Sequence, residues 1–327
     1  ELDRLASAIA GAAKGRERSV YVALDVGPLG ALLEPMGDLS FDDAYTLFAE
    51  VVEAGADAGA DLILIETMSD LREAKAALLA ARERTELPVF VTMTFGEDGR
   101  TFLGTDPAAA AVTLTSLGAD VVGVNCSLGP RELRPILQKM IAATHLPVMV
   151  QPNAGLPRLE EGRTVFDVGP EEFAACARDF LADGAAILGG CCGTTPDHIR
   201  ALRPLLEGRV LPARTPDGLC RLCGWQEEGA DFLVVNAGLP DIDEKVALPA
   251  LVQAIQKVSP LPLVIDCSDP VALERALRLC SGRPILNSVN GEPESMEAML
   301  PLAAKYGTGL IILALDGDGI SDDPAKR

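Results

Sequence analysis

The sequence predicts an α/β fold of the (β/α)8 TIM-barrel type, built as two consecutive series of βα units. Two observations lead to this expectation. Short apolar, β-rich runs alternate with segments that carry helix signals, as in parallel sheets buried on both faces. Nearly every run also ends in a polar or special residue, and barrels assemble their active sites at that C-terminal edge from many strands. An open doubly wound sheet would gather its ligands at one switch point instead.

The first series contains six expected strands. They are SVYVALDVGP (19–28), LILIET (62–67), PVFVTMTF (88–95), VVGVNCS (121–127), PVMVQPNAG (147–155) and AAILGGCCG (185–193). Helix signals lie between them. Ser40 with Asp43, and Asp70 with Glu73, fit capping boxes, and Pro170 fits the first turn of a helix.

A second series follows a turn-rich segment, EGRVLPARTPDG at 207–218, where we place a domain boundary. We expect one domain over residues 1–210 and another over 219–327. The expected strands of the second domain are DFLVVNAG (231–238), PLVIDCSD (262–269), PILNSVNGE (284–292) and GLIILALDGDG (309–319). These runs also end in polar groups, which predicts a second candidate site at their C-terminal edge.

Composition narrows the possible partners. The chain has 327 residues, of which 48% are hydrophobic and only 4% aromatic, which suits buried parallel strands and helices rich in alanine and leucine. The formal net charge of −20 argues against nucleic acid and anionic membranes as partners. No apolar run approaches the roughly 18 residues of a membrane span, and no basic leader opens the chain. We therefore expect a cytoplasmic protein.

The cysteines carry the strongest chemical signal. Cys126 follows one expected strand, and the adjacent Cys191 and Cys192 follow another, so the three could meet at the mouth of a barrel. Thiolates commonly hold Zn²⁺ in a tetrahedral site, which leaves a fourth position for substrate. Adjacent cysteines can both be ligands only where the backbone bends sharply, a freedom supplied by Gly189, Gly190 and Gly193. Scattered cysteines are more often buried structural residues, but the strand ends and the glycines favour a metal site here.

Other reactive residues have simpler interpretations. Cys220-x-x-Cys223 is a rival half-site, but no second pair follows at finger-like spacing. The remaining cysteines have no companion and are expected in the core. Of the two histidines, His145 precedes a strand and is expected at the opposite edge of the barrel, whereas His198 is expected to cap or pack at the start of a helix. Histidine acid–base chemistry therefore has little to work with.

Three motifs of the first domain resemble the homocysteine S-methyltransferase family. They are GVNCSLGP (123–130), PNAGLP (152–157) and GGCCGTTPDHI (189–199), and the similarity extends over roughly residues 1–206. The second domain resembles the pterin-binding domain of the cobalamin-dependent methionine synthases. The matching motifs are GADFLVVNAG (229–238), LPLVIDCSDP (261–270), RPILNSVNGE (283–292) and LIILALDGDGI (310–320). The order of the two domains is also that of these enzymes.

The resemblance implies a reaction and its participants. It implies methyl transfer to the thiol of homocysteine, giving methionine, with methylcobalamin held by another module or chain. Methyltetrahydrofolate is implied as a possible methyl donor. The implied zinc ligands and catalytic residues are Cys126, Cys191 and Cys192. The implied contacts are Glu66 and Asn125 for substrate, with Glu66 on the amino group, and Asn236, Asp266 and Asn287 for the pterin ring.

The sequence also departs from the family pattern. The family's first barrel opens with two further strands, bearing an Asp-Gly and a Thr-Asn-Thr motif, and its pterin domain opens with a Gly-Glu-Arg strand. None of these is present, and Val234 stands where the family usually has Asp. We therefore expect two incomplete barrels, with about six and four of eight strands. Two alternatives follow: a zinc- or pterin-binding fragment without turnover, or a homocysteine methyltransferase that uses another donor.

Overall fold

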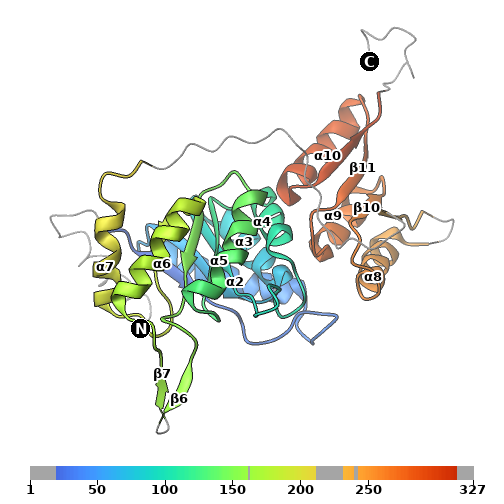
Figure 1. The fold of residues 1–327 in the computed structure, drawn as a ribbon. Helices are drawn as coiled ribbons and strands as arrows, with labels where there is room; N and C mark the ends of the chain where they lie inside the picture. The colour runs from blue at the N-terminus through green and yellow to red at the C-terminus, as the bar shows by residue number, and fades with distance from the viewer. Residues whose placement is uncertain (1–19, 161–162, 211–230, 239–241, 315–327) are drawn as a thin grey trace. The chain divides into compact units, whose positions relative to one another are not determined.

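The chain forms two separate compact units, Glu1–Gly218 and Leu219–Arg327. The computed structural model describes residues 20–160, 163–210, 231–238 and 242–314. Each unit is an α/β structure whose parallel strands alternate with helices (Figure 1). The α/β class expected from the sequence is therefore confirmed.

The main sheet of the first unit has six parallel strands in the order β1-β2-β3-β4-β5-β8. All six expected strands are present. Neighbours in the sheet are also neighbours in the series of βα units, which is the succession of a barrel wall and not of a doubly wound sheet. The strands are β1 (Ala23–Val26), β2 (Leu62–Met68), β3 (Val89–Met93), β4 (Val121–Asn125), β5 (Val148–Gln151) and β8 (Ile187–Leu188).

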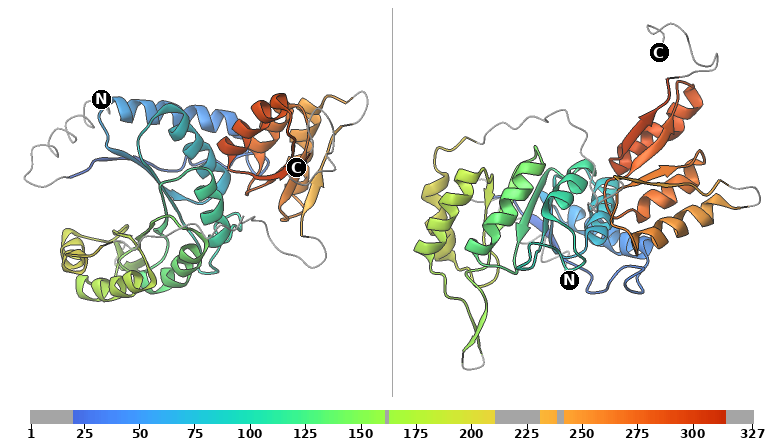
Figure 2. Two further views of the ribbon diagram at one scale, coloured as in Figure 1. Left: turned by 90° about the horizontal axis from the view of Figure 1, so that it is seen from above. Right: turned by 45° about the vertical axis from the view of Figure 1, so that its right-hand side comes forward.

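A helix follows each of these strands along the chain, and the helices lie along the outer side of the curved sheet (Figure 2). They are α2 (Phe41–Asp57), α3 (Leu71–Arg84), α4 (Pro107–Ser116), α5 (Pro130–Ala143), α6 (Pro170–Asp183) and α7 (Pro196–Leu206). The expected helix starts are confirmed. Ser40 accepts a hydrogen bond from the Asp43 N–H at 3.0 Å, and Asp70 accepts one from Arg72 N–H at 2.8 Å. Glu73 does not complete the expected capping box with Asp70, because its carboxylate reaches the loop after β1 and accepts from Leu29 N–H at 2.6 Å.

The core of this unit lies between the sheet and its helices. Alternate strand residues such as Ile63, Ile65, Val89 and Val91 are all fully buried on the helix side. The inner side of the sheet is less covered, and Leu64 is only half-buried there. The alternation leaves the inner side free to carry polar groups near the C-terminal ends of the strands.

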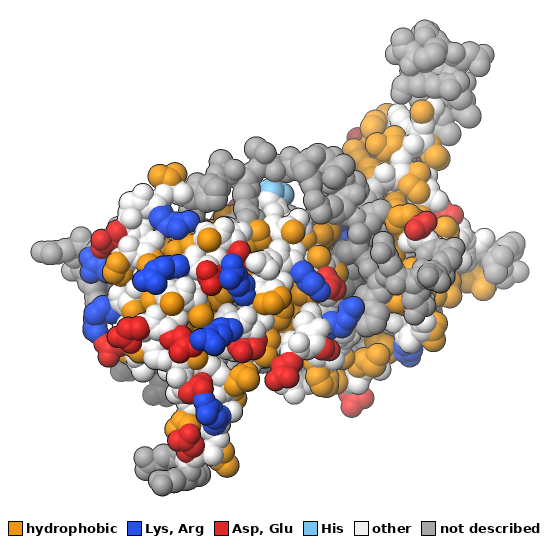
Figure 3. Space-filling model, viewed as in Figure 1, with side chains coloured by type: hydrophobic (Ala, Val, Ile, Leu, Met, Phe, Trp, Pro, Cys, Tyr) orange, Lys and Arg blue, Asp and Glu red, His pale blue; other side chains and the backbone are white. Residues whose placement is uncertain are grey.

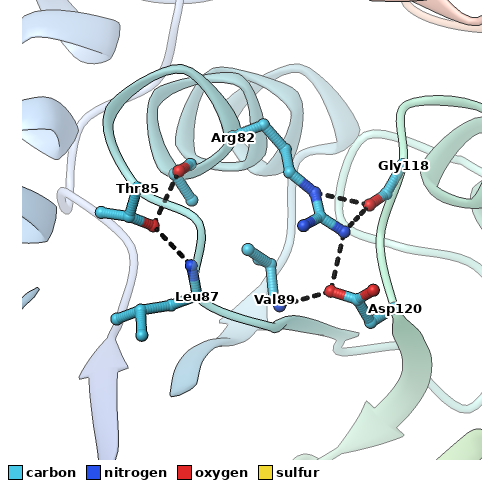
Figure 4. Close-up of polar contacts among 7 residues, drawn as sticks. Arg82, Thr85, Leu87, Val89, Gly118 and Asp120 are labelled. Atoms are coloured by element: carbon cyan, nitrogen blue, oxygen red, sulfur yellow. Dashed lines mark hydrogen bonds and ion pairs between the residues drawn. The ribbon is translucent and has the colours of Figure 1, made fainter. Parts of the chain in front are cut away.

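At the opposite, N-terminal edge of the sheet, a polar network joins two loops (Figure 4). Arg82 donates to the carbonyl of Gly118 and pairs with Asp120 at 2.7 Å. The Asp120 carboxylate accepts in turn from Val89 N–H at 2.8 Å. These contacts fix the starts of β3 and β4 relative to each other, and thereby the register of the two strands.

A two-stranded antiparallel hairpin was not expected from the sequence. Its strands are β6 (Arg158–Glu160) and β7 (Arg163–Val165), inserted between β5 and α6. The hairpin extends away from the helices of its unit (Figure 1). It starts from the same edge of the sheet as the cysteines, because it lies in the connection that follows β5.

The helical surface of the first unit carries interspersed acidic and basic side chains (Figure 3). Arg131 on α5 pairs with Glu172 on α6 at 2.7 Å, and Arg134 pairs with Asp183 at 2.7 Å. Solvent screens surface ion pairs of this kind, so they contribute little to stability. Within the described ranges, no helix is long and apolar enough to cross a membrane.

The second unit contains four parallel strands in the order β12-β11-β10-β9, and all four were expected. They are β9 (Leu233–Val235), β10 (Leu263–Asp266), β11 (Ile285–Val289) and β12 (Gly309–Ile312). The helices are α8 (Glu244–Gln256), α9 (Pro270–Leu279) and α10 (Pro293–Tyr306). Fully buried residues such as Leu248, Ile265, Leu273 and Leu286 form its core.

Candidate metal centre

The structure brings Cys126, Cys191 and Cys192 together at the C-terminal edge of the main sheet. Their sulfur atoms all lie within 4.8 Å of one another, and the Cys126 and Cys192 sulfurs are 3.7 Å apart. Tetrahedral Zn²⁺ with Zn–S bonds of about 2.3 Å would place two sulfurs about 3.8 Å apart. The donor set and its spacing therefore fit a zinc ion that has three protein ligands and one open position.

Cys126 is placed by an unusual backbone conformation. It directly follows β4, and both Cys126 and Ser127 have left-handed φ values, of 60° and 58°. Residues other than glycine rarely adopt this region, and when they do the strain is concentrated at functional sites. Hydrogen bonds from Cys126 N–H to Gln151 C=O (3.0 Å) and from Leu128 N–H to Cys126 C=O (2.7 Å) hold the turn. The turn aims the thiol toward the end of β8.

The Cys191–Cys192 pair is held against the segment after β5. Cys191 N–H donates to Pro152 C=O at 2.9 Å, and Cys192 N–H donates to the buried Asn153 side chain at 3.1 Å. The flanking glycines serve two purposes. Gly193 has a left-handed φ of 80°, as the bend requires, and a Cβ there would lie 2.3 Å from the Phe166 ring. The other two, Gly189 and Gly190, are needed for close approach to neighbouring side chains.

The sulfurs influence one another's protonation. Hydrogen bonds, the largest from the Cys191 thiol, lower the pKa of Cys126 to about 5. The same hydrogen bond raises the pKa of Cys191, and burial raises the pKa of Cys192. In the absence of a cation, the cluster thus favours one thiolate stabilised by two thiols. A divalent cation supplies the charge that holds all three sulfurs deprotonated.

Glu66, at the end of β2, lies on the inner side of the sheet beside the cysteine cluster. Burial raises the pKa of its carboxyl, and the charges of Asp25 and Cys126 raise it further. A hydrogen bond from the Gln151 side chain acts in the opposite direction. Sequence reasoning gave neither Asp25 nor Gln151 a role at the site, although both are polar residues at strand ends.

Asn125, expected to contact substrate, is fully buried. Its Oδ1 accepts from Thr67 N–H at 2.9 Å and from the Thr92 hydroxyl at 2.8 Å, and its Nδ2 donates to the Thr67 hydroxyl at 2.7 Å. Thr67 has a left-handed φ of 62° and follows Glu66 directly. In this arrangement Asn125 joins the end of β4, which carries Cys126, to the end of β2, which carries Glu66.

The histidines lie where the sequence placed them. His198 starts α7, where its Nδ1 contacts Thr195 N–H at 3.1 Å and its Nε2 contacts Val168 C=O at 2.9 Å. The ring is 5% exposed and packs edge-on against Phe173. His145 is exposed and precedes β5, at the opposite edge of the sheet from the cysteines. Neither ring is free to act at the cluster.

The polar residues expected to bind a pterin lie at the C-terminal edge of the second sheet. Asn236 Nδ2 donates to the Asp266 carboxylate at 3.0 Å. Asp266 on β10 is in register with Asn287 on β11. Val234, in place of the family's Asp, is 64% exposed. The three polar side chains are therefore gathered at one edge without a carboxylate from position 234.

The remaining cysteines add no second cluster within the described part of the chain. Cys267 and Cys280 are buried, as expected of core residues. Cys176 was also expected in the core but is only half-buried on α6, where burial raises the pKa of its thiol. The rival pair Cys220 and Cys223 lies outside the described residues.

Comparison with known proteins shows the family to which the chain belongs. The homocysteine S-methyltransferase family matches residues 1–206, and the pterin-binding enzyme family matches residues 224–324. The chain therefore belongs to the homocysteine S-methyltransferase family, and the region after that domain matches the pterin-binding enzyme family.

Particular relatives combine both regions. The chain is 28% identical to methionine synthase from Mycobacterium tuberculosis over an alignment of 368 positions. It is also 28% identical to methionine synthase from Mycobacterium leprae, over an alignment of 369 positions. The matches cover 95% and 94% of this chain but only 31% and 30% of those proteins. The chain thus spans about a third of the length of these relatives.

A solved structure supports the fold of the first unit. The apo form of the homocysteine methyltransferase MmuM from Escherichia coli aligns with a TM-score of 0.50 and 26% identity, covering 62% of this chain and 75% of that one. Its metallated form aligns with a TM-score of 0.50 and 24% identity, covering 62% and 70%.

Proposed function

We propose that this chain catalyses zinc-dependent methyl transfer to the thiol of homocysteine, as the homocysteine and folate half of a cobalamin-dependent methionine synthase. The observation that carries the proposal is the cluster of three cysteine sulfurs, with its 3.7 Å spacing at the C-terminal edge of the sheet. Membership of the homocysteine S-methyltransferase family supports the substrate. Similarity to two methionine synthases supports methylcobalamin, held by another module or chain, as the donor.

Each residue of the site has a role in this proposal. Cys126, Cys191 and Cys192 would hold the zinc, which would bind the substrate thiol at its open position and lower that thiol's pKa. Glu66 offers a carboxylate to the homocysteine ammonium group. The thiolate sulfur would then be the nucleophile for the methyl carbon: the S–C bond would form, and the electron pair of the broken bond would remain on the donor.

The second unit would supply the methyl group through folate. Asn236, Asp266 and Asn287 offer amide and carboxylate groups that suit the donor–acceptor edge of a pterin ring. The contact between Asn236 and Asp266 shows that two of these side chains reach each other. Methyltetrahydrofolate is therefore the proposed ligand at this edge.

Zinc analysis of single-cysteine variants tests the metal site directly. Purified protein should contain one zinc per chain, and Cys126→Ala and Cys192→Ala proteins should lose it. Cys176→Ala is a matched control, because that cysteine is half-buried on α6 away from the cluster. Full zinc content in the Cys126 and Cys192 variants would show that the ion is held elsewhere.

A further inference from the structure

Gln151 carries an unexplained buried acceptor next to the proposed substrate site. Its Oε1 is shielded from solvent and has no hydrogen-bond partner among the residues that the structure describes. The same side chain hydrogen-bonds the Glu66 carboxylate. An unpaired buried acceptor is costly, so each one in a native protein calls for an explanation. A ligand that donates a hydrogen bond beside Glu66 would provide one.

The position of this acceptor is fixed by its surroundings. Gln151 ends β5 in register with Asn125 of β4, so both side chains lie on the inner side of the sheet. A Cβ at position 189 would lie 2.8 Å from the Gln151 Cγ, so the glycine there leaves the room that the side chain occupies. Gln151 C=O also accepts from Cys126 N–H at 3.0 Å. The residue is thus tied both to the cysteine cluster and to Glu66.

Asp25 brings a third acceptor to the same place. It is the penultimate residue of β1 and is in register with Leu64 of β2, two residues before Glu66, so Asp25 and Glu66 project from the same side of the sheet. The charges that act on the Glu66 carboxylate are those of Asp25 and Cys126, both negative. Acidic groups therefore gather on the inner side of the sheet near the C-terminal ends of its strands. Their negative charge favours the binding of a cationic group there.

We propose that Gln151, Asp25 and Glu66 together form a site with three hydrogen-bond acceptors for the α-ammonium group of the substrate. An ammonium group has three N–H donors, and the three side chains offer one oxygen to each. The inference rests on the proposed function, since it takes the substrate to be an amino acid with a thiol. It makes Gln151 and Asp25 specificity residues that select thiols with a free ammonium group over thiols without one.

Calorimetric titration of the zinc-loaded chain with two thiols tests the proposal. Homocysteine carries the ammonium group, and 4-mercaptobutanoic acid is the same molecule without it. The Gln151→Met variant keeps the length of the side chain and removes the acceptor, together with the amide group that donates to Glu66. It should weaken homocysteine binding about tenfold or more, the value of one hydrogen bond to a charged group. Binding of 4-mercaptobutanoic acid should stay within about twofold, since that thiol does not use the acceptor.

Two further variants make the result decisive. Gln138→Met is the same change at an exposed position on α5 and should alter neither affinity. Asp25→Leu changes an exposed residue on the edge strand β1, so it tests the site even if the Gln151 variant does not fold. It should also weaken the binding of homocysteine and leave the binding of 4-mercaptobutanoic acid unchanged. Parallel losses for both thiols, or no loss for either, would overturn the ammonium site.

The experiment also separates this inference from the proposed function. If the zinc-loaded protein binds both thiols equally well, the ammonium site is wrong and the zinc-thiol proposal stands. If it binds neither thiol, the proposed function fails and the inference fails with it.

Discussion

Binding of homocysteine to the zinc-loaded protein should release about one proton at pH 7. The perturbation is addition of the thiol to wild type, to His198→Gln and to Cys191→Ala. Three sulfurs within 4.8 Å of one another leave one position of a tetrahedral site, so one thiol binds per chain. With an unperturbed thiol pKa of about 8.5, about 0.97 of the free thiol is protonated at pH 7 and must lose its proton.

The pH dependence has a definite sign. The proton release is complete well below the pKa of the free thiol and is lost as the pH rises through it, falling to about 0.5 proton at pH 8.5. His198 contributes nothing to this count, because both of its ring nitrogens are engaged with Thr195 and Val168. The His198→Gln protein should therefore release the same proton, whereas Cys191→Ala should release none.

Calorimetry in buffers of different ionisation enthalpy counts the protons. A parallel titration with 4-mercaptobutanoic acid isolates the thiol proton, because this ligand has no ammonium group that could gain or lose a proton on binding. His145→Gln is the matched control, since that histidine is exposed at the far edge of the sheet. Binding without proton release at pH 7, or release that disappears in His198→Gln, would refute the zinc-thiolate mechanism.

Three further predictions concern the rest of the structure. Asn125→Ala should destabilise the first unit by about 3 kcal/mol, because Thr67 N–H and the Thr92 hydroxyl lose their buried acceptor; a loss below about 1 kcal/mol in urea denaturation would contradict this. Arg82→Ala should cost only about 1 kcal/mol, since its ion pair is partly exposed, and should leave zinc content unchanged. Methyltetrahydrofolate should bind only weakly in calorimetry, because Val234 offers no carboxylate; no binding would remove folate from the proposed function, and tight binding would show that the three polar side chains suffice.

The strands and the cysteine cluster could be predicted from the sequence, because both depend on local sequence patterns. All ten parallel strands could be predicted from apolar runs with polar ends. Cys126, Cys191 and Cys192 each follow such a run, so they were expected to lie close together, as they do. Parallel strands share one C-terminal edge, so residues that follow different strands meet without any knowledge of the loops.

The features that the sequence did not reveal depend on side-chain geometry. Nothing in the pattern of β2 shows that Thr67 adopts a left-handed conformation or that Asn125 is used to hold it. The contact between Gln151 and Glu66 crosses the inner side of the sheet, between strands that are not neighbours. The hairpin was missed because its strands, β6 and β7, are three residues long and carry no strong apolar alternation. Gly162 between them was the available turn signal.

In the sequence, the β6–β7 hairpin lies between Cys126, which follows β4, and the Cys191–Cys192 pair, which follows β8. A cut in the hairpin would therefore separate the cysteines of the cluster. Cys126 and Cys192 are 66 positions apart, so an ion that bridges them closes a long loop, which in a chain-entropy estimate is worth about 4 kcal/mol. A cut in the hairpin would give two fragments, one with a single cysteine of the cluster and the other with two. Neither fragment has a complete donor set, so we expect their reassembly to depend on zinc.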